Sequence, residues 1–154
     1  MDKIVLIAAF LIISTASYGQ YKEQIRVMHG YEMGVDKGFF GMNFTGEYFP
    51  LNYFSVAPSF TFFIPATGNA RGFDINARYY YSEKERQWYG LLGYGHYTRI
   101  FEFNPKGREA FHSLNVGGGG MIKLSDEIGI NPEIRYQGGR NDLLFKISMV
   151  YFVN

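Results

Sequence analysis

The chain has no cysteine, so neither a disulfide framework nor a thiolate metal site can contribute to its fold. Its formal net charge is only +1, which gives no bulk attraction for nucleic acid or for an anionic membrane surface. Beyond residue 20, no apolar run approaches the roughly 18 residues that a membrane-spanning helix requires. No segment sustains a 3.6-residue hydrophobic period either, and we therefore expect essentially no helix in the mature protein.

The N-terminus has the features of a secretory signal peptide. Residues 4–13 form an uninterrupted apolar run that is too short to span a bilayer as a helix, and residues 14–19 are small or turn-prone. Ser17 and Gly19 suit cleavage before Gln20, with cleavage after Ala16 as the alternative. We therefore predict a signal peptide at 1–19 and an exported domain at 20–154. Exported chains without disulfides are common in Gram-negative envelopes, and the missing cysteine excludes a lipoprotein anchor.

The remaining sequence is rich in β-forming residues, with 13 tyrosines, 15 phenylalanines and 19 glycines in the whole chain. From about residue 25 onward it divides into segments of roughly ten residues whose apolar and polar residues alternate, separated by turn residues. The predicted strands are residues 25–35, 40–49, 53–64, 72–81, 88–101, 112–122, 128–137 and 143–153. The sequence therefore predicts a single all-β domain with eight strands.

Strand length separates two environments for such a domain. Strands of soluble proteins average about five or six residues, whereas outer-membrane strands need about 9–11 to cross the hydrocarbon layer. The predicted segments match the longer class, and aromatic residues gather at their ends, as in the girdles of membrane barrels. One predicted rim contains Tyr48, Phe49, Tyr53, Phe54, Tyr79, Tyr80, Tyr81, Trp88, Tyr89, Tyr151 and Phe152. The other contains Phe39, Phe40, Phe62, Phe63, Phe73, Phe101, Phe103, Phe111 and Phe145.

The whole pattern over about residues 21–154, including segments such as Gly46-Glu47-Tyr48-Phe49, resembles the small outer-membrane β-barrel proteins. These form the eight-stranded class related to the barrel domain of outer-membrane protein A. The resemblance implies a closed, eight-stranded, antiparallel, up-and-down transmembrane β-barrel. It also implies outer-membrane lipid and the barrel-assembly machinery as partners, with no cofactor and no nucleic acid, and we expect a monomer. The chain departs from the class by ending in Val153-Asn154 after Tyr151-Phe152, because the last residue of such proteins is usually aromatic.

Alternation assigns a charged set to the interior of this barrel. The predicted lumen residues are Arg26, Glu32, Glu47, Asp74, Arg78, Glu133, Arg135 and Lys146. We interpret them as a structural ion-pair network, because an eight-stranded barrel is just wide enough for side chains to fill. A gated proton or ion path is the alternative.

Two prolines and the outer loops complete the prediction. Pro58 and Pro132 lie within predicted strands, and we expect a local bulge at each because proline lacks the ladder donor. The predicted outer loops are residues 36–38, 65–71, 103–110 and 138–142. The longest, around residues 102–109, is the best candidate for contact with a partner, although a solvated connector is the simpler interpretation.

Few motifs suggest chemistry. His112, Ser113 and Asn115 invite comparison with outer-membrane lipid A deacylases, but adjacent strand residues point to opposite faces, so His112 and Ser113 cannot pair without a bulge. His29 and His96 each lie alone on a strand, which makes a metal site unexpected. The four glycines at 117–120 lack the lysine and helix of a phosphate loop, and we expect them to make room for rings such as Tyr94 or Tyr97.

We therefore expect a non-catalytic outer-membrane barrel with a structural or surface-interaction role. A soluble lipocalin-like periplasmic carrier is the second hypothesis, and it would place the apolar faces of the strands inside, around a ligand. A lipid-modifying barrel enzyme is the third.

Overall fold

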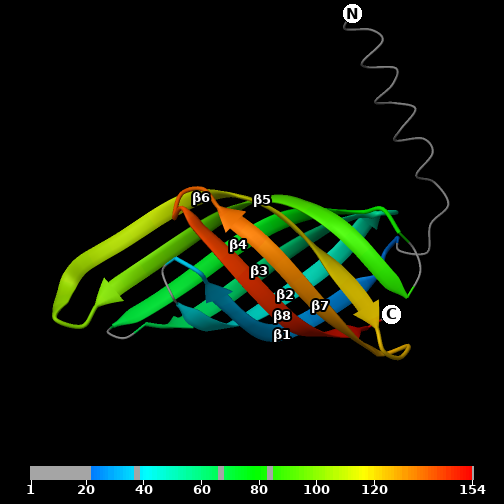
Figure 1. Ribbon diagram of the computed structural model, residues 1–154, viewed down its shortest axis with the longest axis horizontal. Helices are drawn as coiled ribbons and strands as arrows, with labels where there is room; N and C mark the ends of the chain where they lie inside the picture. The colour runs from blue at the N-terminus through cyan, green and yellow to red at the C-terminus, as the bar shows by residue number, and fades with distance from the viewer. Residues whose placement is uncertain (1–21, 37–38, 66–67, 83–84, 154) are drawn as a thin grey trace, which may run out of the picture.

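The computed structural model describes residues 22–36, 39–65, 68–82 and 85–153, which form a closed antiparallel barrel (Figure 1). Each strand pairs with the next along the chain, and the first also pairs with the last. The strands are β1 (Ile25–Gly34), β2 (Phe40–Leu51), β3 (Phe54–Ile64), β4 (Asn69–Tyr80), β5 (Arg86–Phe101), β6 (Asn104–Lys123), β7 (Ile128–Gln137) and β8 (Asp142–Phe152). The predicted eight-stranded, up-and-down barrel is confirmed. The predicted signal peptide lies outside the described residues.

The barrel has two distinct ends. β1 begins where β8 ends, with Arg26 opposite Phe152, and we call this the terminal end. The opposite, distal end holds the β1–β2, β3–β4, β5–β6 and β7–β8 connections (Figure 1). Among the described residues there is no helix with the length and apolarity needed to cross a membrane.

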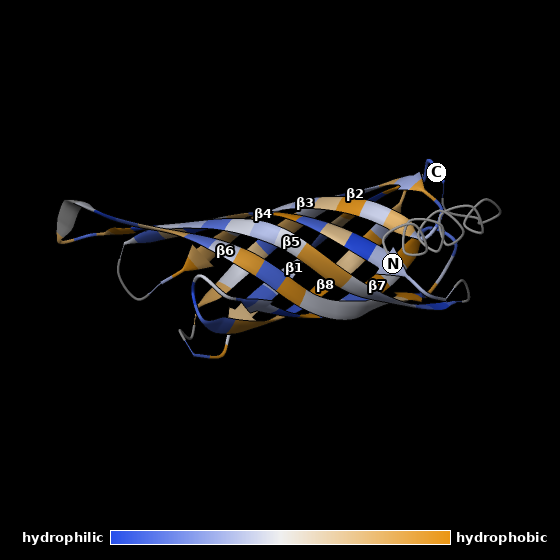
Figure 2. Cartoon of the chain, turned by 90° about the horizontal axis from the view of Figure 1, so that it is seen from above, coloured by the Kyte–Doolittle hydropathy of each residue, from blue (hydrophilic) through white to orange (hydrophobic). Residues whose placement is uncertain are grey.

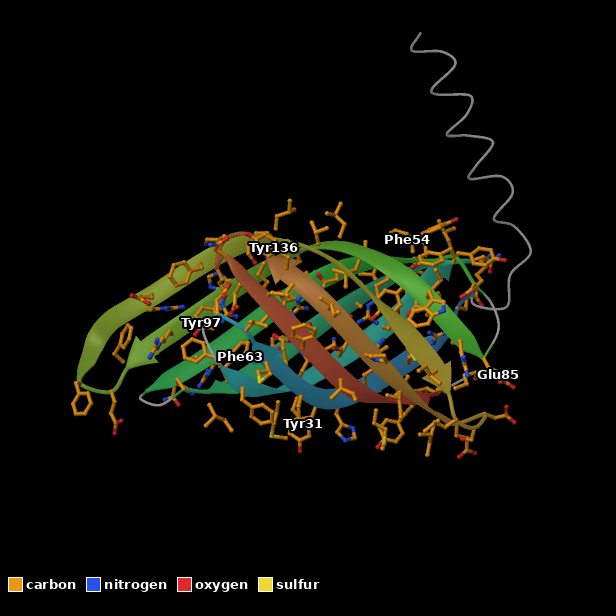
Figure 3. All side chains as sticks on the ribbon, viewed as in Figure 1. Tyr31, Phe54, Phe63, Glu85, Tyr97 and Tyr136 are labelled. Carbon is orange, nitrogen blue, oxygen red and sulfur yellow. The ribbon has the colours of Figure 1, made fainter. Side chains whose placement is uncertain are left out.

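Side chains alternate between the outside and the inside along the strands, and the apolar set lies outside. Hydrophobic and hydrophilic residues accordingly follow one another along the strands in Figure 2. Phe60 and Ile147 are 54 % and 57 % exposed, whereas Lys146, next to Ile147, is 5 % exposed. Tyr31 and Tyr136 likewise point away from the barrel (Figure 3). This polarity is the reverse of the one that the lipocalin-like hypothesis requires, and that hypothesis is therefore wrong.

Two strands begin three or more residues earlier than the sequence predicts. β4 starts at Asn69 and β6 at Asn104, so residues 69–71 and 104–110 of the predicted outer loops belong to strands. The β5–β6 hairpin turns at Glu102 and Phe103 and projects beyond the rest of the distal end (Figure 1). Residues 105–107 have no partner in the β5–β6 ladder, whose register shifts between Ile100 and Phe101. The turn-forming residues therefore form an irregularity within the hairpin, and regular pairing resumes at Arg108.

The expected bulges at Pro58 and Pro132 are absent. The strand register is the same on both sides of each proline, although the ladder pairs beside it are missing. At Pro132 a side chain takes over part of the missing bonding, since the Asn131 amide donates to the Gly120 carbonyl at 2.7 Å. Gly120 lies opposite Pro132 in this register, so its carbonyl acquires a donor that proline cannot provide.

The predicted aromatic rims are only partly correct. Phe49, Tyr80 and Tyr89 lie inside the barrel at its terminal end, whereas Tyr79 and Trp88 face outward. The distal end shows the same split, because Phe40 and Phe62 face outward and Phe63 faces inward (Figure 3). Adjacent residues of a strand point to opposite faces, so a run of aromatic residues cannot all contribute to one outer girdle.

Candidate functional site

The barrel interior contains all eight charged residues that alternation assigns to it, and each is at most 5 % exposed. Five strands supply them, namely β1, β2, β4, β7 and β8. Ion pairs join the whole set into one network of four anions and four cations. The buried charge therefore balances within the set.

Glu133 on β7 is the central carboxylate. Its Oε2 lies 2.6 Å from Nη2 of Arg78 and accepts a 2.7 Å hydrogen bond from the Tyr89 hydroxyl. Its Oε1 lies 3.5 Å from Nζ of Lys146 and 3.7 Å from Nη1 of Arg135. One carboxylate thus contacts three cations from three strands, which ties β4 to β7 across the lumen and adds an ion pair between the neighbouring strands β7 and β8.

Glu47 on β2 continues the network toward the terminal end. It lies 3.3 Å from Arg78 and 3.7 Å from Arg26, and it accepts hydrogen bonds from Ser55 at 2.6 Å and Tyr80 at 2.8 Å. The Arg26 guanidinium also stacks over an aromatic ring inside the barrel, that of Phe49, at 4.5 Å. The Tyr80 hydroxyl and the Arg26 guanidinium therefore connect the charged network to the aromatic rings inside the terminal end of the barrel.

Arg135 on β7 extends the network toward the distal end. Its Nη2 lies 2.9 Å from Glu32 of β1 and 3.3 Å from Asp74 of β4. Asp74 also accepts hydrogen bonds from Asn115 at 2.7 Å and Gln137 at 3.0 Å. The hydrogen bonds to Asp74 offset part of the cost of removing these charges from water.

Apolar layers lie inside the barrel on both sides of the charged network, and sequence reasoning missed them. At the terminal end the layer contains Met28, Phe49, Tyr80, Tyr89, Leu91, Met121 and Val150. At the distal end it contains Phe63, Ala70 and Tyr97, with Phe39 against them. The alternation of the strands could have predicted these layers, because residues two apart share a face. Tyr80, for example, shares its face with Arg78 along β4, so it also points into the lumen.

The histidines are arranged differently from the sequence prediction. His112 faces outward and Ser113 inward, as expected of neighbours in a strand. His96 does not lie alone, however, because it is paired with His112 across the β5–β6 ladder, with ring centroids 4.6 Å apart. The His112 ring also contacts the Tyr94 hydroxyl. Within the part of the chain that the structure describes, no three His, Asp or Glu side chains come together as a metal site.

The four glycines at 117–120 bring the backbone close to aromatic rings, but not to the rings that the sequence suggested. A Cβ on Gly119 would lie 2.5 Å from the Tyr89 hydroxyl and 2.6 Å from the Pro132 carbonyl. A Cβ on Gly120 would lie 2.8 Å from the Trp88 ring. The neighbouring rings are therefore Tyr89 and Trp88, and Tyr94 and Tyr97 lie elsewhere on β5.

Fold and polarity together define the class: this is a closed eight-stranded barrel with the architecture of outer-membrane β-barrels. The N-terminal β-barrel domain of Pseudomonas aeruginosa OprF is 13 % identical, with a TM-score of 0.74, and the match covers 86 % of this chain and 99 % of that one. Ail, the attachment invasion locus protein of Yersinia pestis, is 19 % identical, with a TM-score of 0.60 and coverage of 85 % and 98 %.

A de novo designed transmembrane β-barrel is also similar, at 11 % identity and a TM-score of 0.62, covering 88 % of this chain and all of that one. No protein-family model matches the sequence, and no curated protein sequence matches it either. At these identities the likeness shows the fold alone.

Proposed function

We propose that this chain is an integral outer-membrane β-barrel with a structural or surface-interaction role and no catalytic activity. The observation that carries the proposal is the apolar outer surface of a closed barrel around a charged interior. In lipid every backbone group must be bonded within the protein, and a closed barrel is the only β architecture that achieves this. The same surface in water would expose a large apolar area over every strand.

The lumen of this barrel is sealed rather than conducting. Charged side chains fill its middle and apolar layers lie at both ends. A proton path is disfavoured because the carboxylates alternate with arginines, as in Glu47–Arg78–Glu133–Arg135, and a guanidinium does not release its proton in proteins. The lumen network thus has a structural role, which is to hold the strands of the barrel wall together.

The distal end is the surface-facing end. Outer-membrane barrels have both termini and short turns on the periplasmic side and longer connections outside. The β5–β6 hairpin projects at the distal end and therefore would reach beyond the membrane (Figure 1). Ail, whose name describes an attachment invasion locus protein, shares this fold, which supports an interaction role for the projecting end. Lipid and the barrel-assembly machinery are the proposed partners, and the barrel acts as a monomer.

Membrane fractionation combined with heat-modifiable gel mobility tests the proposal. The full chain, expressed in a Gram-negative host, should be recovered with the outer membrane, and the unheated protein should migrate differently from the boiled protein. A periplasmic binding protein and a resident outer-membrane barrel serve as fraction markers. Recovery in the soluble periplasmic fraction would refute the proposal.

A further inference from the structure

A small cavity lies at the distal mouth of the barrel, between the start of β2, the β5–β6 hairpin and the β7–β8 turn. Its volume is about 100 Å³. The lining residues are Phe39, Tyr97, Arg99, Glu109, Phe111 and Arg140. Since a water molecule takes up about 30 Å³ of liquid, the cavity has room for roughly three waters or for one oxyanion group.

Arg99 supplies a cation without a counter-ion to this cavity. Its guanidinium lies over the rings of Phe101 at 4.4 Å and Phe39 at 4.9 Å. Among the described residues it has no ion pair, although Glu109 lies opposite it in the β5–β6 ladder. Its Nε is buried and has no hydrogen-bond partner in the described part of the chain. A partly buried cation of this kind is stabilised by an anion that enters the cavity.

Tyr97 supplies a hydroxyl donor in the same cavity. The residue, which is labelled in Figure 3, is only 5 % exposed, and its Oη is buried without a hydrogen-bond partner among the described residues. Its ring is fixed by the Arg140 guanidinium, which lies over it at 4.1 Å. Arg140 is itself bonded to Gln137 at 3.2 Å and paired with Asp142 at 3.4 Å, so its charge already has a partner. Arg140 therefore forms a wall of the cavity, and Arg99 and Tyr97 hold the unused donors.

We propose that this cavity binds the carboxylate or phosphate group of an acidic saccharide. Arg99 Nε and the Tyr97 hydroxyl donate to the oxyanion, the ring of Phe111 flanks the sugar, and the exposed Glu109 accepts from a sugar hydroxyl. The inference rests on the proposed surface-interaction role and names the ligand class for it.

Titration of the purified, folded chain with small sugars tests the site. A polyoxyethylene detergent is suitable because it carries neither sugar nor phosphate. Glucuronate and glucose 6-phosphate should bind saturably and at least tenfold more tightly than glucose, measured by calorimetry or by NMR shifts of the β5–β6 hairpin. If only one of the two acidic sugars binds, the result identifies the preferred oxyanion and still supports the site. Absence of saturable binding by both would overturn the proposal.

Matched variants locate the binding. Arg99→Gln should weaken the binding of acidic sugars at least tenfold, and Tyr97→Phe about threefold, because each removes a donor from the oxyanion. Arg108→Gln is the control. Arg108 is exposed on the same hairpin but lies outside the cavity lining, and its replacement removes the same charge. The affinity of this variant for acidic sugars should stay within twofold of that of the unchanged chain. An equal loss in Arg108→Gln and Arg99→Gln would show non-specific attraction and overturn the proposal.

Two further measurements test the ligand class and the folding of the variants. Inorganic phosphate bound as tightly as glucose 6-phosphate would overturn the saccharide assignment, because the Phe111 ring and Glu109 would then contribute nothing to binding. Heat-modifiable mobility reports whether each variant folds. If Arg99→Gln does not fold, the affinities of Tyr97→Phe and Arg99→Lys for acidic sugars test the site in its place. A chain that fractionates with the outer membrane yet binds no acidic sugar would refute this inference and leave the proposed location intact.

Discussion

Glu133 is the residue on which the lumen depends most, because it alone contacts three of the four lumen cations. Replacement by glutamine keeps its size but removes its charge, which leaves Arg78, Arg135 and Lys146 facing one another with three carboxylates among four cations. Breaking a buried pair in this way costs about 3–5 kcal/mol. We expect Glu133→Gln to lower the free energy of unfolding by that amount, measured by urea titration of the barrel in lipid vesicles.

Glu127→Gln provides the comparison for this measurement. Glu127 lies exposed in the β6–β7 turn and undergoes the same chemical change without any lumen contact. Its unfolding midpoint should match that of the unchanged chain. If Glu133→Gln also unfolds at the unchanged midpoint, the network does not stabilise the barrel.

The membership of the lumen could be predicted from the sequence, whereas its contacts could not. Period-two alternation places Arg135 and Glu32 on the inner face of their own strands, and local sequence is sufficient for that. Their 2.9 Å contact depends on how β1 and β7 are placed around the closed barrel, which no local pattern encodes. The pairing of His96 with His112 was missed for a similar reason, since it follows from the position of the hairpin turn.

At the scale of the element, β6 shows how the packing of the barrel wall depends on a glycine that leaves room for a neighbouring side chain. Gly119 faces Tyr89 so closely that a methyl group would overlap its hydroxyl and the Pro132 carbonyl, and the carbonyl cannot move without disturbing the ladder. We expect Gly119→Ala to cost about 1–3 kcal/mol, the usual range for overpacking a filled interior. Unfolding titration in vesicles measures the change.

Gly90→Ala is the matched control on the neighbouring strand, because a Cβ there meets nothing within 4 Å. Its stability should be unchanged within about 0.5 kcal/mol, as for substitutions away from packed features. Equal losses at Gly90 and Gly119 would mean that loss of glycine in a strand, and not contact with Tyr89, determines the effect.

Element lengths were the least predictable part of the fold. Turn-forming residues at 104–107 suggested a loop, and residues 105–107 are unpaired where the register shifts, but β6 begins at Asn104 and pairs regularly with β5 from Arg108 onward. Turn propensity acts over a few residues, and the energy of a long ladder sums over many pairs. The prolines also mislead, because the register continues past both of them, and at Pro132 the Asn131 amide donates to the facing Gly120 carbonyl.

At the scale of the whole molecule, a filled lumen predicts the absence of a pore. The charged network and the apolar layers at both ends occupy the interior, so no aqueous path is expected to cross it. Insertion of the folded barrel into planar lipid bilayers should produce no stable conductance above that of a heat-denatured sample. Reproducible single-channel openings of uniform size would contradict the sealed lumen.

The orientation of side chains in lipid is the central claim, and a nitroxide scan of residues 144–150 on β8 tests it most directly. The chain contains no cysteine, so each position can be labelled singly without other changes. In lipid vesicles, oxygen accessibility should be high at residues 145, 147 and 149 and low at 144, 146, 148 and 150, with a period of two. A flat profile, or one with the opposite phase, would contradict the account.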